Sequence, residues 1–264
     1  MKKYVSLGLV LGLLGCNATM PKIGDGSAKT VATGAAAGGT SQGANDKIAH
    51  CAEPLGTVAM VEDQSATWYR SMQQHELGST LPVLRLMVQQ SNCFVVVERG
   101  RAMQNMNQER ALAQSGEIRA GSAFGKGQMV AADYTMNPSV TFSAKGTSGV
   151  GGALAGVVGG VFGALAAGMK TNDASTVLML IDNRSGVQIS VAEGSARNTD
   201  FSAGFGSWFG AWGSAKGYTD TPQGKVVVAA FVDSYNQMVK ALQNYQAQEV
   251  KGGLGKGGRL KVGN

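Results

Sequence analysis

The chain has 264 residues, 39 of them glycine, and a formal net charge of +6. Its length suffices for one folded domain with tails. All six excess positive charges lie outside the body, in a leader and in the Gly-rich tail, at Lys2, Lys3, Lys251, Lys256, Arg259 and Lys261. The neutral body excludes nucleic acid as the expected partner. The tail, residues 251–264, is either a solvated end or a contact for lipid phosphates or anionic peptidoglycan.

The first 17 residues read "MKKYVSLGLVLGLLGCN", with two lysines, a short apolar run and small Gly15 before Cys16. This pattern predicts a signal peptide over residues 1–15 and lipidation at Cys16. Asn17 favours the outer membrane, so outer-membrane lipid is the first expected partner. The alternative is an ordinary signal peptide with an incidental cysteine.

Residues 16–50 consist mostly of Ala, Gly, Ser, Thr and Lys, with almost nothing to bury. We expect a flexible tether here, because about 30 such residues reach roughly 30 Å from the anchor to the folded body. The body itself is expected over residues 51–250.

The first half of the body alternates between strand-like and helical patterns. Residues 56–61 and 94–98 are short apolar runs typical of strands. Residues 79–91 predict a helix, which Thr80 caps and in whose first turn Pro82 lies. A second helix follows over residues 99–116, and Gly116 ends it.

The second half predicts three strands and a long helix. The strand-like runs cover residues 132–144, 175–186 and 187–196, and a tight turn joins the last two. The final helix starts at Pro222 and has an apolar stripe at helical spacing, made of Val228, Phe231, Val232, Tyr235, Met238, Val239 and Leu242. This order predicts an α/β sandwich with helices packed on a mixed sheet.

Two cysteines remain besides Cys16. Cys51 and Cys93 each precede a strand-like run, so neighbouring strands would bring them to the same end of the sheet. In an oxidising compartment this favours a disulfide, with two separately buried thiols as the alternative.

No constellation typical of catalysis occurs. There are only two histidines, His50 beside the tether and His75 in a polar loop, which argues against a Ser/His/Asp triad or a zinc site. The segment "GSAFGKGQM" resembles a phosphate loop, but Gly127 stands where Ser or Thr is needed. We therefore expect no enzyme, no cofactor and no metal.

The segment "CFVVVERGRAMQNMNQER", residues 93–110, resembles the CsgG/HfaB family of outer-membrane lipoproteins, whose members secrete curli subunits or anchor holdfast polymer. The family pattern is a hydrophobic strand ending in Glu-Arg, then Leu-Gln-Asn and Asn-Glu-Arg in a helix. Here Glu98-Arg99, Met103-Gln104-Asn105 and Asn107 with Glu109-Arg110 correspond, with one extra residue before Glu109. A second match, "GYTDTP", precedes the last helix.

The resemblance implies a periplasmic α/β domain that assembles into a homo-oligomeric ring and works with a secreted or envelope partner. It also implies two membrane-spanning β-hairpins per subunit, which would fall at about Thr141–Ala174 and Asn198–Lys216. These hairpins would complete a large shared barrel.

The sequence departs from the family in these two segments, about 146–170 and 198–217. A barrel strand alternates apolar and polar residues, whereas no polar side chain occurs from Gly149 to Met169. At a spacing of four, the first segment instead has a row of small residues: Ser148, Gly152, Gly156, Gly160, Ala164 and Gly168. Such a glycine zipper lets helices pack closely in lipid, and 21 helical residues span about 31 Å.

The second segment, "FSAGFGSWFGAWGSAKGY", places aromatic residues on one helical face, namely Phe201, Phe205, Trp208, Phe209 and Trp212. Both segments are predicted to enter the membrane as helices or helical hairpins. The alternative is that both are soluble Gly-rich excursions.

Two functions follow from these alternatives. Inserted segments predict a ring or pore that exports or anchors an envelope polymer or protein. Segments folded on the body predict a periplasmic adaptor without a pore, which contacts peptidoglycan or activates a cell-wall synthase.

Overall fold

The structure is a computed structural model that describes residues 47–122, 125–142, 173–197, 218, 221–250 and 253–255. Its centre is one five-stranded sheet with the strand order β2-β1-β3-β4-β5. The strands are β1 (Thr57–Met60), β2 (Val95–Val96), β3 (Tyr134–Phe142), β4 (Asp173–Asp182) and β5 (Gln188–Arg197). Strand β1 runs parallel to β2 and β3, while β3, β4 and β5 are antiparallel neighbours. The predicted mixed sheet is therefore confirmed.

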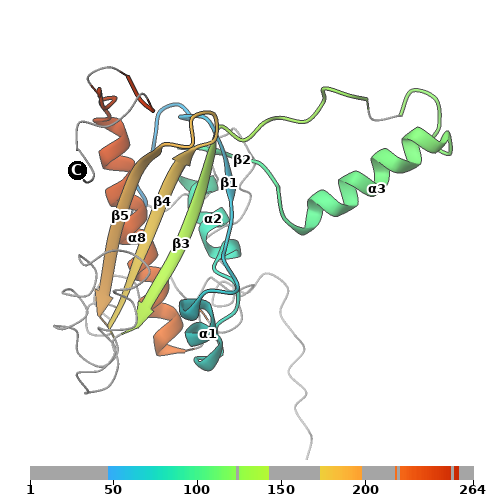
Figure 1. Cartoon of the computed structure of the whole chain (residues 1–264). Helices are drawn as coiled ribbons and strands as arrows, with labels where there is room; N and C mark the ends of the chain where they lie inside the picture. Colours follow the sequence, from blue (N-terminus) through green and yellow to red (C-terminus); the bar gives the residue numbers. More distant parts are fainter. Residues whose placement is uncertain are drawn as a thin grey trace, which may run out of the picture.

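Three helices cover one face of this sheet, as Figure 1 shows, and the core lies between them and the strands. They are α1 (Thr67–Gln74), α2 (Leu81–Ser91) and α8 (Pro222–Gln243). Every second strand residue points to this core, including Met136, Val140, Leu178 and Leu180, which are at most 2% exposed.

Helix α8 buries the apolar stripe that the sequence predicted. Six of its seven residues are buried, and Leu242 is partly buried against the same core. The helix begins at Pro222, and the side chain of Thr221 accepts a hydrogen bond from the backbone N–H of Gly224 at 3.0 Å. A polar cap and a proline in the first turn thus fix where the helix starts.

Three sequence predictions need correction within this body. The polar stretch after β1 contains helix α1, which the sequence analysis left without an element. The strand predicted over residues 94–98 has only two residues in ladder geometry. Thr80 precedes α2 as predicted, but its side chain makes no cap; its backbone N–H and its hydroxyl donate instead to Glu62 Oε1 at 2.8 and 2.7 Å.

Helix α3 (Arg101–Ser115) corrects the expectation that all helices pack on the sheet. It ends where predicted, with Gly116 in the left-handed region at φ 85°. However, none of its residues is buried, and Figure 1 shows it standing away from the sheet.

Within the described ranges, no helix is both long and apolar enough to cross a bilayer. Lipidation at Cys16, residues 16–46 of the predicted tether, most of the tail and both Gly-rich segments lie outside these ranges, whereas residues 47–50 belong to the described body, in which Ile48 is 2% exposed. Also outside these ranges lie the predicted packing residues Gly152, Gly156, Gly160, Gly168, Phe205, Trp208 and Trp212. Their membrane role stays a prediction.

Candidate functional site

The most unusual feature of the described chain is an arm that has no partner in the structure. We define the arm as helix α3 together with the returning segment, residues 116–122 and 125–130, which leads back to β3 (Figure 1). A helix of 15 residues is marginal in water unless a packed face stabilises it, and α3 buries no residue. The arm is therefore a surface that is available for a contact.

The base of the arm is fixed by Glu98 and Arg99, which lie between β2 and α3. Glu98 forms an ion pair with Arg85 of α2 at 2.9 Å and accepts a hydrogen bond from the backbone N–H of Gly100. Arg99 donates to its neighbour's carbonyl oxygen at 2.9 Å and also to the carbonyl oxygen of Val130 on the returning segment. These contacts hold the first turn of α3 against the end of the sheet.

A second arginine, Arg110, joins the middle of α3 to the returning segment. Arg110 donates to the carbonyl oxygen of Gly125 at 3.2 Å, and the backbone N–H of Gly125 donates to Gln128 Oε1 at 2.9 Å. Guanidinium groups thus hold the returning segment at two places, one just before the helix at Arg99 and one on the helix at Arg110. The sequence motif from Glu98 to Arg110 therefore builds and stiffens the arm.

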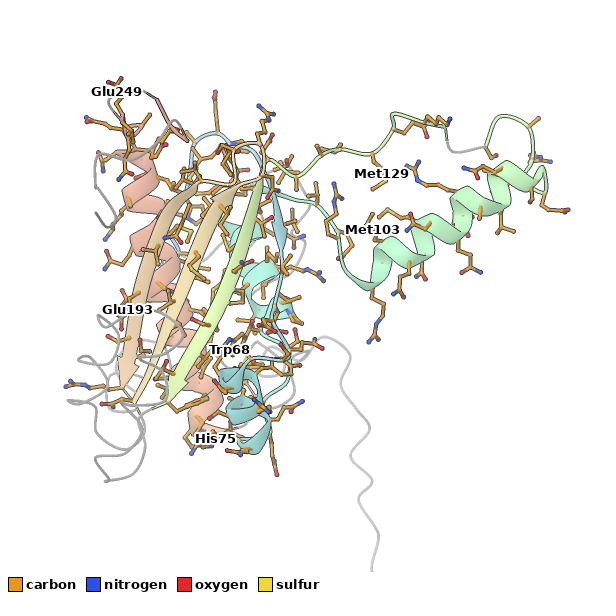
Figure 2. The ribbon with its side chains drawn as sticks, viewed as in Figure 1. Trp68, His75, Met103, Met129, Glu193 and Glu249 are labelled. Carbon is orange, nitrogen blue, oxygen red and sulfur yellow. A yellow bond between two sulfur atoms is a disulfide. The ribbon has the colours of Figure 1, made fainter. Side chains whose placement is uncertain are left out.

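The arm encloses an open crevice of about 580 Å³ between α3 and the returning segment. Val97, Met106, Met129 and Val130 contribute its apolar lining, and charged residues of the motif surround them. Figure 2 shows Met103 and Met129 on the sides of α3 and the returning segment that face each other. The exposed apolar side chains of the arm also include Leu112, at 40% exposure.

A second uncovered surface is the face of the sheet opposite the three packed helices. Register places Val177, Met179 and Ile181 of β4 on this face, because Leu178 and Leu180 point to the core. Val191 of β5 lies beside Met179 and is 50% exposed. Polar residues of β3 and Glu193 of β5 border this apolar strip, which we call the open face.

One polar group on the open face lacks a partner. Asn137 pairs in register with Met179, and its side-chain oxygen Oδ1 is buried without a hydrogen bond. A buried acceptor without a donor costs free energy, so Asn137 is a locally destabilising residue of the sheet.

The arm and the open face also differ in charge. Between Glu98 and Val130 the chain has five basic and three acidic residues. The open face has Asp173 and Glu193 against Arg197 as its charged groups. Glu193 accepts a hydrogen bond from Ser175 at 2.7 Å, and Arg197 lies 3.6 Å from Asp173.

Both Gly-rich segments leave the body at the same end of the sheet. The first connects the end of β3, Phe142, to the start of β4, Asp173, and the second follows the end of β5. Two contacts hold the roots of these segments. His75 packs on Phe142 with ring centroids 4.6 Å apart, and the Tyr218 hydroxyl donates to the carbonyl oxygen of Gly78 at 2.7 Å. Burial raises the pKa of Tyr218, which keeps this donor neutral.

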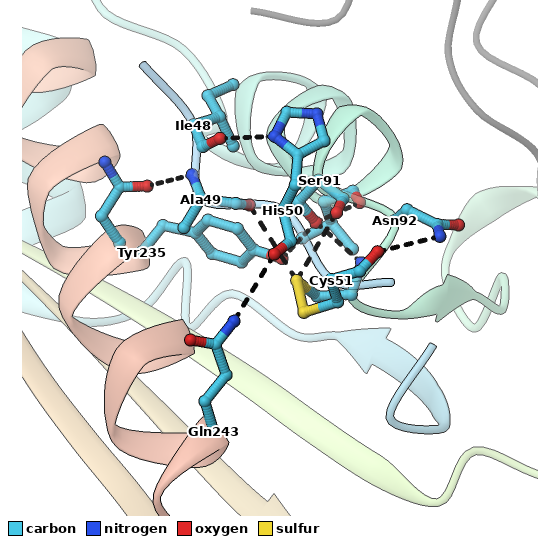
Figure 3. The surroundings of a disulfide bond; sticks show 11 residues. Ile48, Ala49, His50, Cys51, Ser91, Asn92, Tyr235 and Gln243 are labelled. Atoms are coloured by element: carbon cyan, nitrogen blue, oxygen red, sulfur yellow. Dashed lines mark hydrogen bonds between the residues drawn. A yellow bond between two sulfur atoms is a disulfide. The ribbon is translucent and has the colours of Figure 1, made fainter. Parts of the chain in front are cut away.

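Residues 47–51, at the N-terminal end of the described chain, are hydrogen-bonded to α8 and α2, and we call them the strap. Asn236 of α8 accepts from the backbone N–H of Ala49 and donates to the carbonyl oxygen of Lys47, both at 2.7 Å. Next to this strap a disulfide joins Cys51 to Cys93, with their Cα atoms 4.8 Å apart (Figure 3). The covalent bond and the amide contacts together fix the point at which the tether meets the body.

The family model described as "Curli production assembly/transport component CsgG" matches residues 38–259. The chain belongs to the CsgG family. This confirms the resemblance found at residues 93–110, and the match covers the arm, the whole sheet and α8. The CsgG description is that of an assembly and transport component and names no enzymatic activity.

Comparison with solved structures finds the hypothetical protein CT253 from Chlamydia trachomatis. Its sequence is 12% identical, the aligned part covers 72% of this chain and 97% of that one, and the TM-score is 0.30. No curated protein matches the chain.

The structure brings together some predicted residues and gives others no chemical role. Cys51 and Cys93 meet, whereas His50 and His75 lie at different places, one beside the disulfide and one against Phe142. Among the described residues, no group of three His, Cys, Asp or Glu side chains could hold a metal ion. The sequence analysis missed the arm and the open face. The many polar residues of α3 agree with its exposure, but they do not by themselves distinguish an arm from a helix that packs on the sheet through Met103 and Met106.

Proposed function

We propose that this CsgG-family chain is an outer-membrane lipoprotein that assembles side by side into a ring. The ring exports or anchors a secreted or envelope protein or polymer. Family membership supports the role in assembly and transport, and the leader sequence supports anchoring through Cys16. The observation that supports a ring is that each subunit has two different uncovered surfaces, the helical arm and the open face of the sheet.

The lateral contact places the arm of one subunit on the open face of the next. The two surfaces are different, so the contact is head to tail, and repeated head-to-tail contacts close into a ring when the rotation allows it. Leu112 and the arm methionines meet the strip around Val191 and Met179. The excess of basic residues on the arm favours the acidic border at Glu193.

The membrane contact uses the two Gly-rich segments. Because both leave the same end of the sheet, every subunit of a ring presents them on the same side. The tether predicted from the sequence would connect the strap beside Asn236 to the lipid anchor, and about 30 residues of this composition would reach roughly 30 Å.

Charge substitutions test the lateral contact. We expect Leu112→Asp on the arm and Val191→Asp on the open face each to abolish the oligomer of detergent-extracted protein, because each buries a charge at the contact. Tyr245→Asp is the matched control. Tyr245 has the same exposure as Val191, 50%, but it follows α8 and lies on neither the arm nor the open face. Size-exclusion chromatography with light scattering and negative-stain imaging give the readout.

Rings that survive both arm and face substitutions would exclude this interface. A wild-type protein that is monomeric in detergent and in membranes would instead favour the adaptor without a pore. Unchanged incorporation of radiolabelled palmitate into a Cys16→Ser variant would exclude Cys16 as the site of lipidation.

A further inference from the structure

The methionines of this chain divide sharply by position. Of the nine in the described ranges, five belong to the core, namely Met60, Met72, Met87, Met136 and Met238, each at most 5% exposed. The four accessible ones are Met103, Met106 and Met129 on the arm and Met179 on the open face. All four therefore lie on the two surfaces that the proposed ring would join.

The arm methionines are at least partly exposed to solvent within one small region. Met106 and Met129 line the crevice between α3 and the returning segment, and Met129 is 37% exposed. Met103 lies one helical turn before Met106 and faces the same gap (Figure 2). An oxidant in solution can reach these thioethers without any opening of the fold.

We propose that the arm methionines are an oxidation site that controls assembly of the ring. Part of this proposal rests on the proposed function, because it assumes that the arm is a subunit contact. The oxidant is a hypohalous acid or a hydroperoxide. In the reaction with hypochlorous acid, the sulfur takes the oxygen atom and loses two electrons, and the products are methionine sulfoxide, chloride and a proton.

Oxidation changes the arm from an apolar to a polar surface. Methionine sulfoxide is polar and chiral, so a contact that packs thioethers against Val191 and Ile181 loses its apolar complement. In the subunit before assembly the arm is uncovered, whereas in the ring the contact shields it. Oxidation therefore traps free subunits and leaves existing rings intact until they dissociate.

The core methionines provide an internal control. Solvent reaches Met72, Met87, Met136 and Met238 only if the domain opens, since each has 0% exposure. A dose of oxidant that modifies the arm leaves the fold itself unchanged. The effect on assembly can thus be separated from denaturation.

The test uses full-length protein, dissociated to monomers in detergent and treated with limiting hypochlorous acid. Peptide mass spectrometry should show the arm methionines modified at least about tenfold faster than the core methionines. After removal of the oxidant, the wild type should no longer form oligomers, while its circular dichroism stays unchanged. A variant with Met103→Leu, Met106→Leu, Met129→Leu and Met179→Leu should assemble normally after the same treatment.

A second measurement covers the case in which the leucine variant fails to assemble even without oxidant. Treatment of oxidised wild type with methionine sulfoxide reductases should restore assembly, because it returns the thioethers. Equal oxidation rates of arm and core methionines would overturn the site. If protein oxidised at the arm assembles normally, oxidation does not regulate assembly, and the proposal that the chain forms a ring is unaffected.

Failure of the proposed function gives a different pattern. If untreated protein never assembles, both the ring and its regulation by oxidation are refuted. The ratio of the oxidation rates of arm and core methionines, from mass spectrometry, still tests whether the arm is an oxidation site. Slower oxidation of the arm in assembled than in dissociated protein would support both proposals together.

Discussion

Gly194 of β5 lies directly against Ala230 of α8. A Cβ atom built on Gly194 would stand 2.2 Å from the carbonyl oxygen of Ala230 and equally close to the backbone nitrogen of Ser234. No flexible side chain can move aside here, because both contacts are with the helix backbone. This glycine therefore sets how closely the last helix approaches the edge of the sheet.

We expect Gly194→Ala to lower the free energy of unfolding by at least about 1–3 kcal/mol, since α8 must shift away from β5. Gly78→Ala is the control, because nothing lies within 4 Å of a Cβ at that position. Urea denaturation of both variants measures the difference. Equal stability of the two variants would show that the close approach is not needed.

The disulfide is expected to stabilise the body by restricting the unfolded chain. It closes a loop with a sequence separation of 42, and a double variant with Cys51→Ser and Cys93→Ser should lose about 2–4 kcal/mol. Thermal unfolding with and without a reducing agent measures this loss. Alkylation of the denatured, unreduced protein checks the bond itself, and two free thiols would refute it.

The first Gly-rich segment can be tested by two substitutions at one position. Gly156→Leu keeps the segment apolar but should prevent close packing of helices, so the protein stays in the outer-membrane fraction and loses detergent-stable oligomers. Gly156→Asp should also impair insertion, by roughly 2.5–3.5 kcal/mol on insertion scales. Crosslinking and bilayer conductance are the measurements. Wild-type behaviour of both variants would mean that the segment neither inserts nor packs.

The sequence predicted those helices and strands in which the spacing of apolar residues indicates a buried face. The stripe from Val228 to Leu242 repeats at helical spacing because α8 packs along the sheet, so its position followed from the residues alone. The short α1 escaped notice because its segment, "TWYRSMQQ", is mostly polar and its N-cap residue, Ala66, has no capping side chain. Its buried residues are Tyr69 and Met72, and Met72 belongs to the core.

The arm could be predicted as a helix but not as an arm. Its spacing and Gly116 define its ends, yet periodicity alone does not tell whether Met103 and Met106 meet the sheet or solvent. The open face could not be predicted either, because it depends on all helices lying on one side of the sheet. Register then decides that Met179 and Val191, rather than their neighbours, remain uncovered.

The central claim is that the arm of one subunit contacts the open face of the next. The most direct measurement is chemical crosslinking between chains with Leu112→Cys and chains with Val191→Cys, mixed before assembly and treated with a short bismaleimide. The account predicts a crosslinked heterodimer in the mixture, and a ladder up to the full ring for chains that have both cysteines. Intact rings in which neither combination crosslinks would contradict it.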